Sequence, residues 1–361
     1  MNTAKISVQV TVYNKELYLA KCLNSILNQT LKDIEIVCVD DASTDNSLSI
    51  LKDYQRNDNR IKIFKHSRNR GKIHARKTAF IEAHGDFMVF VDADDFIESD
   101  MCELLYKKAI KELADFVQFN GQVYDPEHIL TKTLYQRYNN RFSKGADCKF
   151  EGNEIFKHYA FPIRNNLCLS MYKKNLFKKV IPFISYNAPR QGDDSLLSFF
   201  LMYYARKYVF YNKIFYNYRA SNTSDNLNNI SLDLAKSQIE GRSKVIFHAK
   251  SFAEANNLKW DNHEPPFFVL SRILVGYSAD FMNRCYEAVG EEKEDLIRHF
   301  GDCFGGEALL FFLKEIENIK TCEYCNNTLR KALSIIYSSK LWKATKSLQW
   351  RIRKLRGYKE I

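Results

Sequence analysis

Apolar residues along the first hundred positions follow two alternating patterns. Helical spacing near residues 17–28, 43–57 and 73–84 predicts three amphipathic helices. Short, mostly apolar runs lie around these helices, as expected of strands that are buried on both faces. The four runs are 6–11, 34–39, 61–64 and 87–91. This alternation predicts an α/β fold with a Rossmann-like, mostly parallel sheet that has helices on both faces.

The pattern changes at about residue 115 and again at about residue 225. The middle part mixes polar loops with aromatic strands near 116–119 and 208–215 and a helix near 195–205. Helical spacing dominates the last part, with helices expected over 232–255, 267–288, 291–319 and 328–358. We therefore expect three parts: 1–115, 116–224 and a C-terminal helical region over 225–361.

The chain has 361 residues and a formal charge of +11, which bears on its partners more than on its fold. Such an excess favours nucleic acid, an anionic membrane surface or phosphorylated substrates. The residues after Met1 lead directly into the first expected strand, and no apolar run reaches the ~18 residues that span a bilayer. We expect a cytoplasmic protein that can attach to a membrane surface without crossing it.

Nine cysteines are scattered along the chain without the spacing of a disulfide framework. Their odd number and their scatter fit reduced thiols that are mostly buried. Cys322 and Cys325 form a single CxxC pair with neither a second pair nor a histidine pair nearby. Zinc binding is the alternative there, but we favour incidental residues of a helix.

Acidic residues follow two of the expected strands. Asp40 ends the second strand, and Asp92 and Asp94 follow the fourth. Because ligands bind beyond the carboxyl ends of parallel strands, these carboxylates are expected to share one binding edge. A pair spaced i, i+2 can reach a ribose together with a hard cation, Mn²⁺ or Mg²⁺. The alternative is helix capping and turn formation, which we favour for residues 43–45.

Five short motifs occur in order around these acids. They are Val12-Tyr13-Asn14, Ser25-Ile26-Leu27-Asn28-Gln29-Thr30, Val39-Asp40-Asp41-Ala42-Ser43-Thr44-Asp45, Arg68-Asn69-Arg70-Gly71 with Ala75-Arg76, and Gly85-Asp86 before Asp92-Ala93-Asp94-Asp95. Over about its first 220 residues the chain resembles the family 2 glycosyltransferases. The resemblance implies a GT-A fold and an inverting transfer, with a nucleotide-sugar-binding half in 1–115 and an acceptor-binding half in 116–224.

The resemblance also implies roles for residues near the nucleotide. Thr11 and Tyr13 are expected to border it, and Asp40 is expected to bond the base. Arg76 is expected near the base or the diphosphate, with a surface ion pair as the alternative. Thr11 replaces a proline that is usual in the family, which alters the rigidity of the loop but removes no functional group.

Asp92, Ala93 and Asp94 are expected to bind the rest of the donor. By resemblance, Asp92 contacts the ribose and Asp94 coordinates Mn²⁺ or Mg²⁺. Uridine diphosphate is the expected carrier. Glucose, galactose and their N-acetylated amines all stay open as the sugar. The expected acceptor is a bacterial lipooligosaccharide, capsule chain or other lipid-linked glycan.

The resemblance places the catalytic base in an acidic pair before a helix. Asp193 and Asp194 match that position, and we assign Asp194 as the base with Asp193 as its neighbour and candidate acceptor ligand. The alternative is a pair of helix-capping residues, which is compatible with catalysis. Arg219 is expected to meet the diphosphate, where a guanidinium suits phosphate oxygens. A surface arginine is the alternative.

The C-terminal segment 340–361 carries eight basic residues and one acid, with apolar residues at helical spacing and two tryptophans. Such a basic amphipathic helix can lie on an anionic membrane. The alternatives are packing against the domain and contact with a second copy of the chain in a homo-oligomer.

Other classes of protein lack their signatures here. The segment after the first strand contains no glycine, which argues against a nicotinamide enzyme, and the chain has no P-loop. A sugar-nucleotide-forming nucleotidyltransferase is the nearest enzymatic alternative, although its glycine-rich loop is missing. A non-enzymatic polyanion-binding protein would explain the charge, but the expected crevice is acidic, so we expect no nucleic-acid partner.

Overall fold

The computed structural model describes residues 4–132, 135–136, 139–140, 147–152, 154–155, 166–185, 188–189, 192–220, 232–258, 299 and 302–303. Contacts group the chain into two compact units, Met1–Thr223 with His248–Leu270, and Ser224–Phe247 with Ser271–Ile361. The expected division into 1–115, 116–224 and 225–361 stays a prediction. Apart from residues 299, 302 and 303, the helices expected over 267–288, 291–319 and 328–358 lie outside the described residues. The CxxC pair and the basic segment 340–361 lie outside them too.

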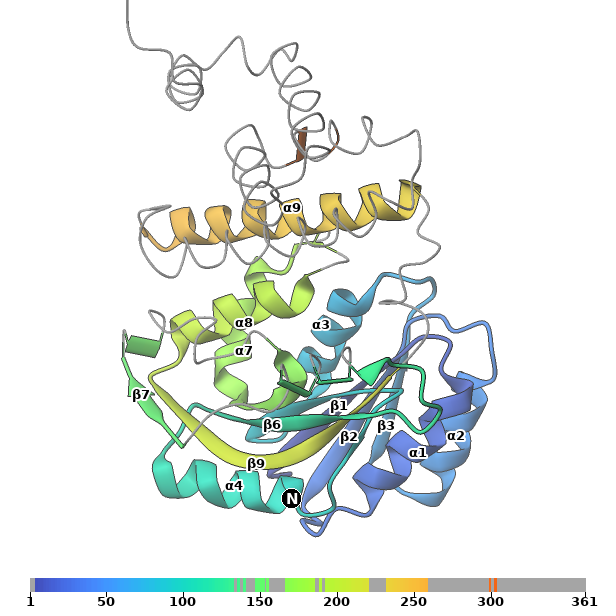
Figure 1. Ribbon diagram of the computed structural model, residues 1–361. Coiled ribbons are helices and arrows are strands. Elements are labelled where there is room, and N and C mark those ends of the chain that lie inside the picture. The colour runs from blue at the N-terminus through green and yellow to red at the C-terminus, as the bar shows by residue number, and fades with distance from the viewer. Residues whose placement is uncertain are drawn as a thin grey trace, which may run out of the picture. The chain divides into compact units, whose positions relative to one another are not determined.

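The four strands predicted in the first hundred residues are present and parallel (Figure 1). They are β1 (Ile6–Val12), β2 (Ile34–Asp40), β3 (Ile61–Lys65) and β4 (Phe87–Asp92), in the order β3-β2-β1-β4. The predicted helices that connect them are α1 (Glu16–Leu27), α2 (Ser47–Asn57) and α3 (Lys72–Glu82). The chain steps outward from β1 to β3 and then returns past β1 to β4. Because such crossovers are right-handed, α3 lies on the opposite face from α1 and α2.

Burial explains why these segments fold as they do. Strand β2 is buried at all seven positions, and β4 is buried at five of its six, because helices cover both faces of the sheet. The buried side chains of α1 recur at intervals of three and four residues, which places them on one face. They are Leu19, Cys22, Leu23 and Ile26.

The second half of the domain continues the same sheet with mixed strand directions. Strand β8 (Ser170–Lys173) pairs antiparallel with both β4 and β6 (Phe116–Tyr124). Strand β9 (Lys207–Arg219) runs parallel to β6, and β5 (Phe96–Ile97) and β7 (Lys149–Glu151) pair antiparallel with β9. The α/β fold predicted from the sequence is confirmed, and its parallel part forms the first half.

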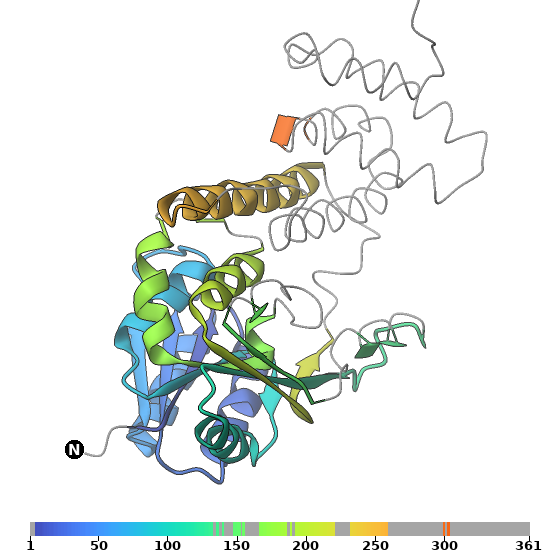
Figure 2. The same ribbon diagram turned by 90° about the vertical axis from the view of Figure 1, so that its left-hand side faces the viewer.

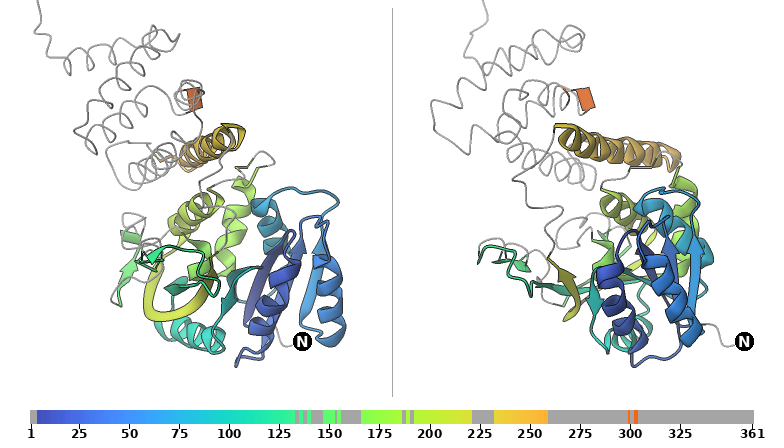
Figure 3. Two further views of the ribbon diagram at one scale, coloured as in Figure 1. Left: turned by 45° about the vertical axis from the view of Figure 1, so that its right-hand side comes forward. Right: turned by 90° about the vertical axis from the view of Figure 1, so that its right-hand side faces the viewer.

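Strand β9 curves strongly along this half of the sheet (Figure 3). Its pairing with β6 shifts register on both sides of Asn120, and such irregularities increase strand bend and twist. Helix α4 (Met101–Glu112) lies on one face of this half, and α7 (Lys174–Val180) and α8 (Asp193–Tyr204) lie on the other (Figures 1 and 2). Helices α4 and α7 and strands β5, β7 and β8 were not predicted from the sequence.

Aromatic side chains fill the core on the α7 and α8 side. Phe177 of α7 packs against Phe80 and Phe90, with ring centroids 4.3 and 5.8 Å apart. Phe200 of α8 stacks on Phe252 of α9 (Leu232–Ala255) at 4.4 Å, and α9 confirms the helix predicted over 232–255. Such ring pairs stabilise the packing beyond the area that they bury. The core therefore holds α7 against α3 and β4, and α8 against α9.

Two further expectations concern cysteines and membrane spans. The six cysteines within the described ranges are free, and four of them are buried, as predicted. Among the described residues, no helix has the length and apolar character needed to cross a membrane.

Candidate active site

The carboxyl ends of β1, β2 and β4 meet at one edge of the sheet. In the strand register Val12 lies opposite Asp40, and Thr11 lies opposite Asp92, so the predicted shared edge is confirmed. Asp40 is fully buried and accepts one hydrogen bond on Oδ1, from the backbone N–H of Ser43 at 3.3 Å. Its Oδ2 is buried without a partner, which leaves one acceptor free.

The loops after β1 and β2 are tied to each other beside this edge. Asn14, at φ 52°, donates its backbone N–H to Ser43 Oγ at 3.1 Å, and its side-chain oxygen accepts from the N–H of Thr44 at 2.8 Å. Asp45 accepts from the N–H groups of Ser47 and Glu16, each at 3.0 Å, and so satisfies the first turns of both α2 and α1. Capping is confirmed for Asp45, whereas Ser43 and Thr44 bind the neighbouring loop instead.

Asp95 fixes the turn that carries the Asp92–Asp94 motif. It is buried and accepts from the hydroxyl of Tyr216 at 2.6 Å and the backbone N–H of Arg219 at 2.8 Å. Burial raises the pKa of Asp95 well above its usual value, and the nearby charges of Asp94 and Asp92 raise it further. The Tyr216 hydroxyl also accepts from the N–H of Asp92 at 3.1 Å. The turn is thus held on β9 by a carboxyl group whose raised pKa favours the protonated form.

Asp92 is ionised and contacts two cations. Lys72 Nζ lies 2.7 Å from its Oδ2, and Arg76 Nη2 lies 3.6 Å from its Oδ1. Burial alone would raise the pKa of Asp92, but Lys72 and Arg76 outweigh that effect and lower the pKa to about 2. Asp92 therefore remains a charged acceptor at every pH at which the protein is expected to work.

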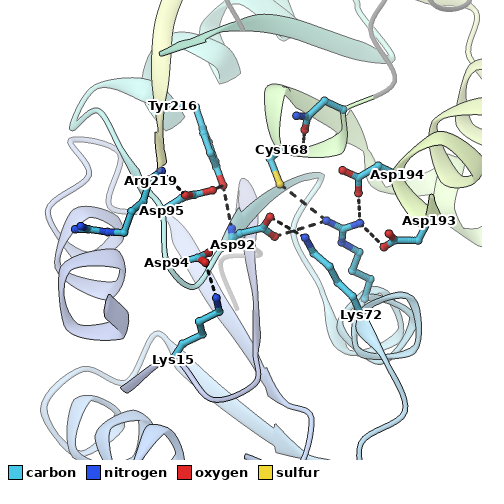
Figure 4. Close-up of polar contacts among 12 residues, drawn as sticks. Lys15, Lys72, Asp92, Asp94, Asp95, Cys168, Asp193, Asp194, Tyr216 and Arg219 are labelled. Carbon is cyan, nitrogen blue, oxygen red and sulfur yellow. Dashed lines mark hydrogen bonds and ion pairs between the residues drawn. The ribbon is translucent and has the colours of Figure 1, made fainter. Parts of the chain in front are cut away.

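Arg76 joins the edge of the sheet to the start of α8, because it contacts Asp92, Asp193 and Asp194, which Figure 4 labels. Its side chain is only 1% exposed, so the alternative of a surface ion pair is wrong. Arg76 Nη1 lies 2.7 Å from Asp193 Oδ2 and also contacts Asp194 Oδ1. The predicted acidic pair thus lies beside Asp92, although more than a hundred residues separate them in the chain.

The two acids of this pair differ in exposure. Burial raises the pKa of Asp193, and Arg76 opposes that rise while Asp194 adds to it. The side chain of Asp194 is 34% exposed, against 12% for Asp193, so Asp194 is the more accessible of the two acids. Gly192 precedes them at φ 79°, a left-handed conformation that favours glycine. This turn presents both acids in the first turn of α8, where the N-cap is Gly192 and not one of the two acids.

Asp94 lies on the outer side of the turn. Lys15 Nζ is 2.5 Å from its Oδ2, and the two side chains are 32% and 23% exposed. Within the described part of the chain, no three His, Cys, Asp or Glu residues converge as they would in an all-protein metal cage. Mg²⁺ uses only one or two protein carboxylates beside phosphate oxygens and water, and its hard-oxygen preference is shared by Mn²⁺. The Asp94 carboxylate therefore fits such a cation.

Arg219 lies in an aromatic setting next to the turn. Its guanidinium carbon is 4.8 Å from the ring centroid of Tyr18 and 5.1 Å from that of Tyr124. The side chain is 11% exposed, so the alternative of a surface arginine is wrong, and its Nε is buried without a hydrogen-bond partner. Tyr13, by contrast, is 44% exposed at the rim of the same edge.

Four residues of this site were missed from the sequence: Lys15, Lys72, Asp95 and Tyr216. Lys72 precedes Arg76 by one helical turn, which was a usable signal because residues four apart share a helix face. Asp95 directly follows the motif. Nothing in the local pattern singles out Lys15 or Tyr216.

Comparisons with known proteins identify the class. A family model described as "Glycosyl transferase family 2" matches residues 7–169. Glycosyltransferase GlyG of Streptococcus pneumoniae serotype 4 is 31% identical over 255 residues, which cover 67% of this chain and 79% of GlyG. The chain belongs to the family 2 glycosyltransferases. The nucleotidyltransferase and polyanion-binding alternatives are therefore wrong.

A second relative is longer. Glycosyltransferase GlyA of the same organism is 35% identical over 221 residues, which cover 60% of this chain but only 30% of GlyA. The chain thus spans less than a third of that relative's length.

Solved structures agree on the fold. TarS 1–349 of S. aureus in complex with UDP-GlcNAc has a TM-score of 0.59 and 18% identity, over 99% of this chain and 93% of that one. The mannosyltransferase PcManGT of Pyrobaculum calidifontis, in complex with GDP-Man and Mn²⁺, has a TM-score of 0.52 and 16% identity, over 98% and 88%. At such identities the likeness concerns the fold, and the predicted GT-A fold is confirmed.

Proposed function

We propose that this glycosyltransferase moves a hexose or N-acetylhexosamine from a UDP-sugar to a hydroxyl of a glycan acceptor, with inversion at the anomeric carbon. One observation carries the proposal. The buried Arg76 contacts both Asp92, at the carboxyl end of β4, and Asp194, at the start of α8. An acid suited to the donor and an acid suited to the acceptor therefore lie beside the same arginine.

The donor side is supported by the free acceptor groups at the sheet edge. The unpartnered Oδ2 of Asp40 can accept from the imide N–H of a uracil, and Asp92 can accept from ribose hydroxyls. Thr11 and Tyr13 border this position, and Arg219 lies close enough to the turn to meet a diphosphate. A UDP or UDP-GlcNAc ligand in the TarS structures favours uridine as the carrier, although PcManGT holds GDP-Man.

A divalent cation is part of the proposal. Asp94 would hold Mn²⁺ or Mg²⁺, and the Mn²⁺ in the PcManGT structure supports that choice. When bound, the cation supplies positive charge against the departing diphosphate. Ala93 keeps Asp92 and Asp94 two residues apart, so that one can face the ribose and the other the phosphates.

Asp194 is the proposed base. It would take the proton of the acceptor hydroxyl while that oxygen attacks the anomeric carbon in line with the leaving diphosphate. Arg76 pairs with one oxygen of the Asp194 carboxylate, and the Asp194 side chain stays 34% exposed. Asp193, more buried and also bound to Arg76, would position the acceptor and limit the movement of Asp194.

The proposed acceptor is a lipid-linked glycan, with the basic segment 340–361 holding the protein on an anionic membrane surface. The charge of +11 supports this, and the segment itself lies outside the described residues. Deletion of the residues after Tyr337 should release the protein from vesicles that contain phosphatidylglycerol. Unchanged sedimentation with such vesicles would contradict the membrane role.

A donor screen tests the central claim. UDP-glucose, UDP-galactose and their N-acetylated amines are incubated with the enzyme and Mn²⁺, and release of UDP is measured alongside GDP release from GDP-mannose. We expect UDP release from one or two of the four uridine donors. Release from GDP-mannose alone would overturn the choice of carrier. Full activity in excess EDTA would overturn the metal assignment.

A further inference from the structure

The ion pair between Lys15 and Asp94 occupies the place that the proposed function gives to a divalent cation. The two side chains meet at 2.5 Å, and each is about one-quarter to one-third exposed, at 23% and 32%. Figure 4 shows that Lys15 reaches Asp94 from one side of the turn, whereas Lys72 reaches Asp92 from the other. An ammonium and a divalent cation on the same carboxylate repel each other, so each weakens the binding of the other.

The backbone on both sides of this ion pair is fixed. Lys15 donates its N–H to Ser47 Oγ at 2.8 Å, and its carbonyl accepts from the N–H groups of Tyr18 and Leu19 in the first turn of α1. On the other side, the N–H of Asp95 donates to the carbonyl of Asp92 at 2.9 Å and closes the turn. Separation of the pair therefore requires movement of the lysine side chain alone.

Asp92, on the same turn, forms an ion pair that cannot open in this way. One of its cations is Arg76, which is 1% exposed and also bound to Asp193 and Asp194, so it has no room to leave. Lys15 is a flexible side chain at the rim, and partly exposed ion pairs of this kind are weak. The Lys15–Asp94 pair can therefore open at low cost.

We propose that Lys15 is a resident counter-ion that yields Asp94 to the divalent cation and moves to the donor diphosphate. The inference rests on the proposed function, because it requires the cation at Asp94 and a diphosphate beside it. A diphosphate that binds the same cation would lie next to Asp94, where the displaced ammonium of Lys15 could pair with it. Without donor, the cation displaces Lys15 and leaves it unpaired. With donor, the phosphate oxygens receive Lys15, so donor and cation bind cooperatively.

The test measures Mn²⁺ binding directly, through the electron paramagnetic resonance of free Mn²⁺, with and without saturating UDP. We expect Lys15→Met to bind Mn²⁺ alone about tenfold more tightly than the wild type, a change that corresponds to ~1.4 kcal/mol. The gain in Mn²⁺ affinity on adding UDP should fall by about the same factor, because the lysine no longer links the two ligands. Lys52→Met removes the same charge from an exposed position on α2, and it should match the wild type. Lys15→Arg keeps a cation and should also stay near the wild type.

Asp94→Asn separates the two possible failures. If Asp94→Asn abolishes Mn²⁺ binding and Lys15→Met behaves like Lys52→Met, the counter-ion role is overturned and the metal site stands. If Asp94→Asn binds Mn²⁺ with unchanged affinity, the metal assignment itself fails, and the role of Lys15 falls with it. Tighter Mn²⁺ binding with reduced cooperativity, confined to Lys15→Met, establishes the proposal.

Discussion

Buried acids lie at both ends of the parallel strands, but their partners differ. At the amino end, the Glu35 side chain is 6% exposed, and one of its oxygens is held by a hydroxyl group and two backbone N–H groups. Its Oε1 accepts from Ser7 Oγ at 2.6 Å, from the N–H of Gly85 at 3.0 Å and from the N–H of His84. Lys62 pairs with Oε2 at 2.6 Å.

At the carboxyl end the acids have oxygens that are unpaired or are held only by a cationic side chain. Asp40 has a buried oxygen without a partner, and the partly exposed Asp94 and Asp194 are each paired with a cationic side chain. Asp94 in particular is held by a mobile lysine and not by a backbone N–H group.

The difference teaches how to tell a structural acid from a functional one in this fold. Backbone N–H groups cannot leave their acceptor without local unfolding, so Glu35 contributes to stability. A carboxylate held by a flexible ammonium, or left with a free oxygen, can exchange partners with a ligand. Unpaired or weakly held acids at the carboxyl edge are therefore the ones to test for activity.

The largest expected effect is on catalysis. Asp194→Asn removes the proposed proton acceptor at the carboxyl end and should lower kcat by roughly 10³-fold, within the range for loss of a general base. Donor affinity should change little, since Asp194 lies on the acceptor side. UDP release with acceptor and UDP binding by calorimetry measure the two quantities. A fully active variant would move the base elsewhere.

At the amino end, Gly85→Ala should cause the largest loss of stability. A Cβ there would lie 2.6 Å from the backbone N of Ser7 and 2.7 Å from the carbonyl carbon of Ile6, and this backbone cannot shift without breaking the strand pairing. We expect a loss of about 3 kcal/mol in the free energy of unfolding, measured with guanidinium chloride. Gly152→Ala is the matched control, because its Cβ meets no atom within 4 Å and only the φ of +55° is strained. Equal stability of both variants would contradict the tight approach at Gly85.

The pH dependence of the stability of Glu35→Gln tests whether the buried charge at the amino end stabilises the fold. Burial would raise the pKa of Glu35, but Lys62, Ser7 and the N–H of His84 together lower it. A lowered folded-state pKa contributes stability above the unfolded value of about 4.3, and that contribution is lost as pH falls through the folded pKa. At pH 7 the variant should lose about 2 kcal/mol, and the difference from the wild type should vanish in acid. A difference that persists at pH 3 would show that the charge is not responsible.

Asp95→Asn should have the smallest effect, and its pH dependence has the opposite sign. The raised pKa of Asp95 means that the folded state holds the proton more tightly than the unfolded state. Its stabilising contribution is full below the unfolded pKa and is lost as pH rises through the folded pKa. The amide mimics the neutral acid that the raised pKa favours, so the free energy of unfolding at pH 7 should change by less than about 1 kcal/mol. Strong destabilisation at pH 7 would show that Asp95 is ionised.

Much of the first half could be predicted because its signals are local. Strands β1 to β4 span five to seven residues and are mostly apolar, and the helices between them repeat their apolar residues at helical spacing. Strands β5, β7 and β8 span only two, three and four residues, too few for any periodicity. They form because longer neighbours offer unpaired edges.

The candidate site also contains residues that could be predicted from local signals and residues that could not. Asp40 and Asp92 could be placed together because parallel strands end at one edge, and the acidic pair before α8 stood out through its resemblance to a family motif. The partners of these acids could not be predicted. Long side chains such as Lys15 and Lys72 reach across loops that the local pattern does not relate to one another.

By itself, the sequence determined the parallel half of the sheet, the edge where its acids gather and the family to which the chain belongs. Only the tertiary structure decided the surroundings of each acid. From the sequence alone, Arg76 could be interpreted as a surface residue. In the structure it is buried among three carboxylates, one of which, Asp193 at the start of α8, is 117 positions away in the chain. The physical reason is that periodicity reports which face a residue shares with its neighbours, whereas charge pairing depends on contacts between distant segments.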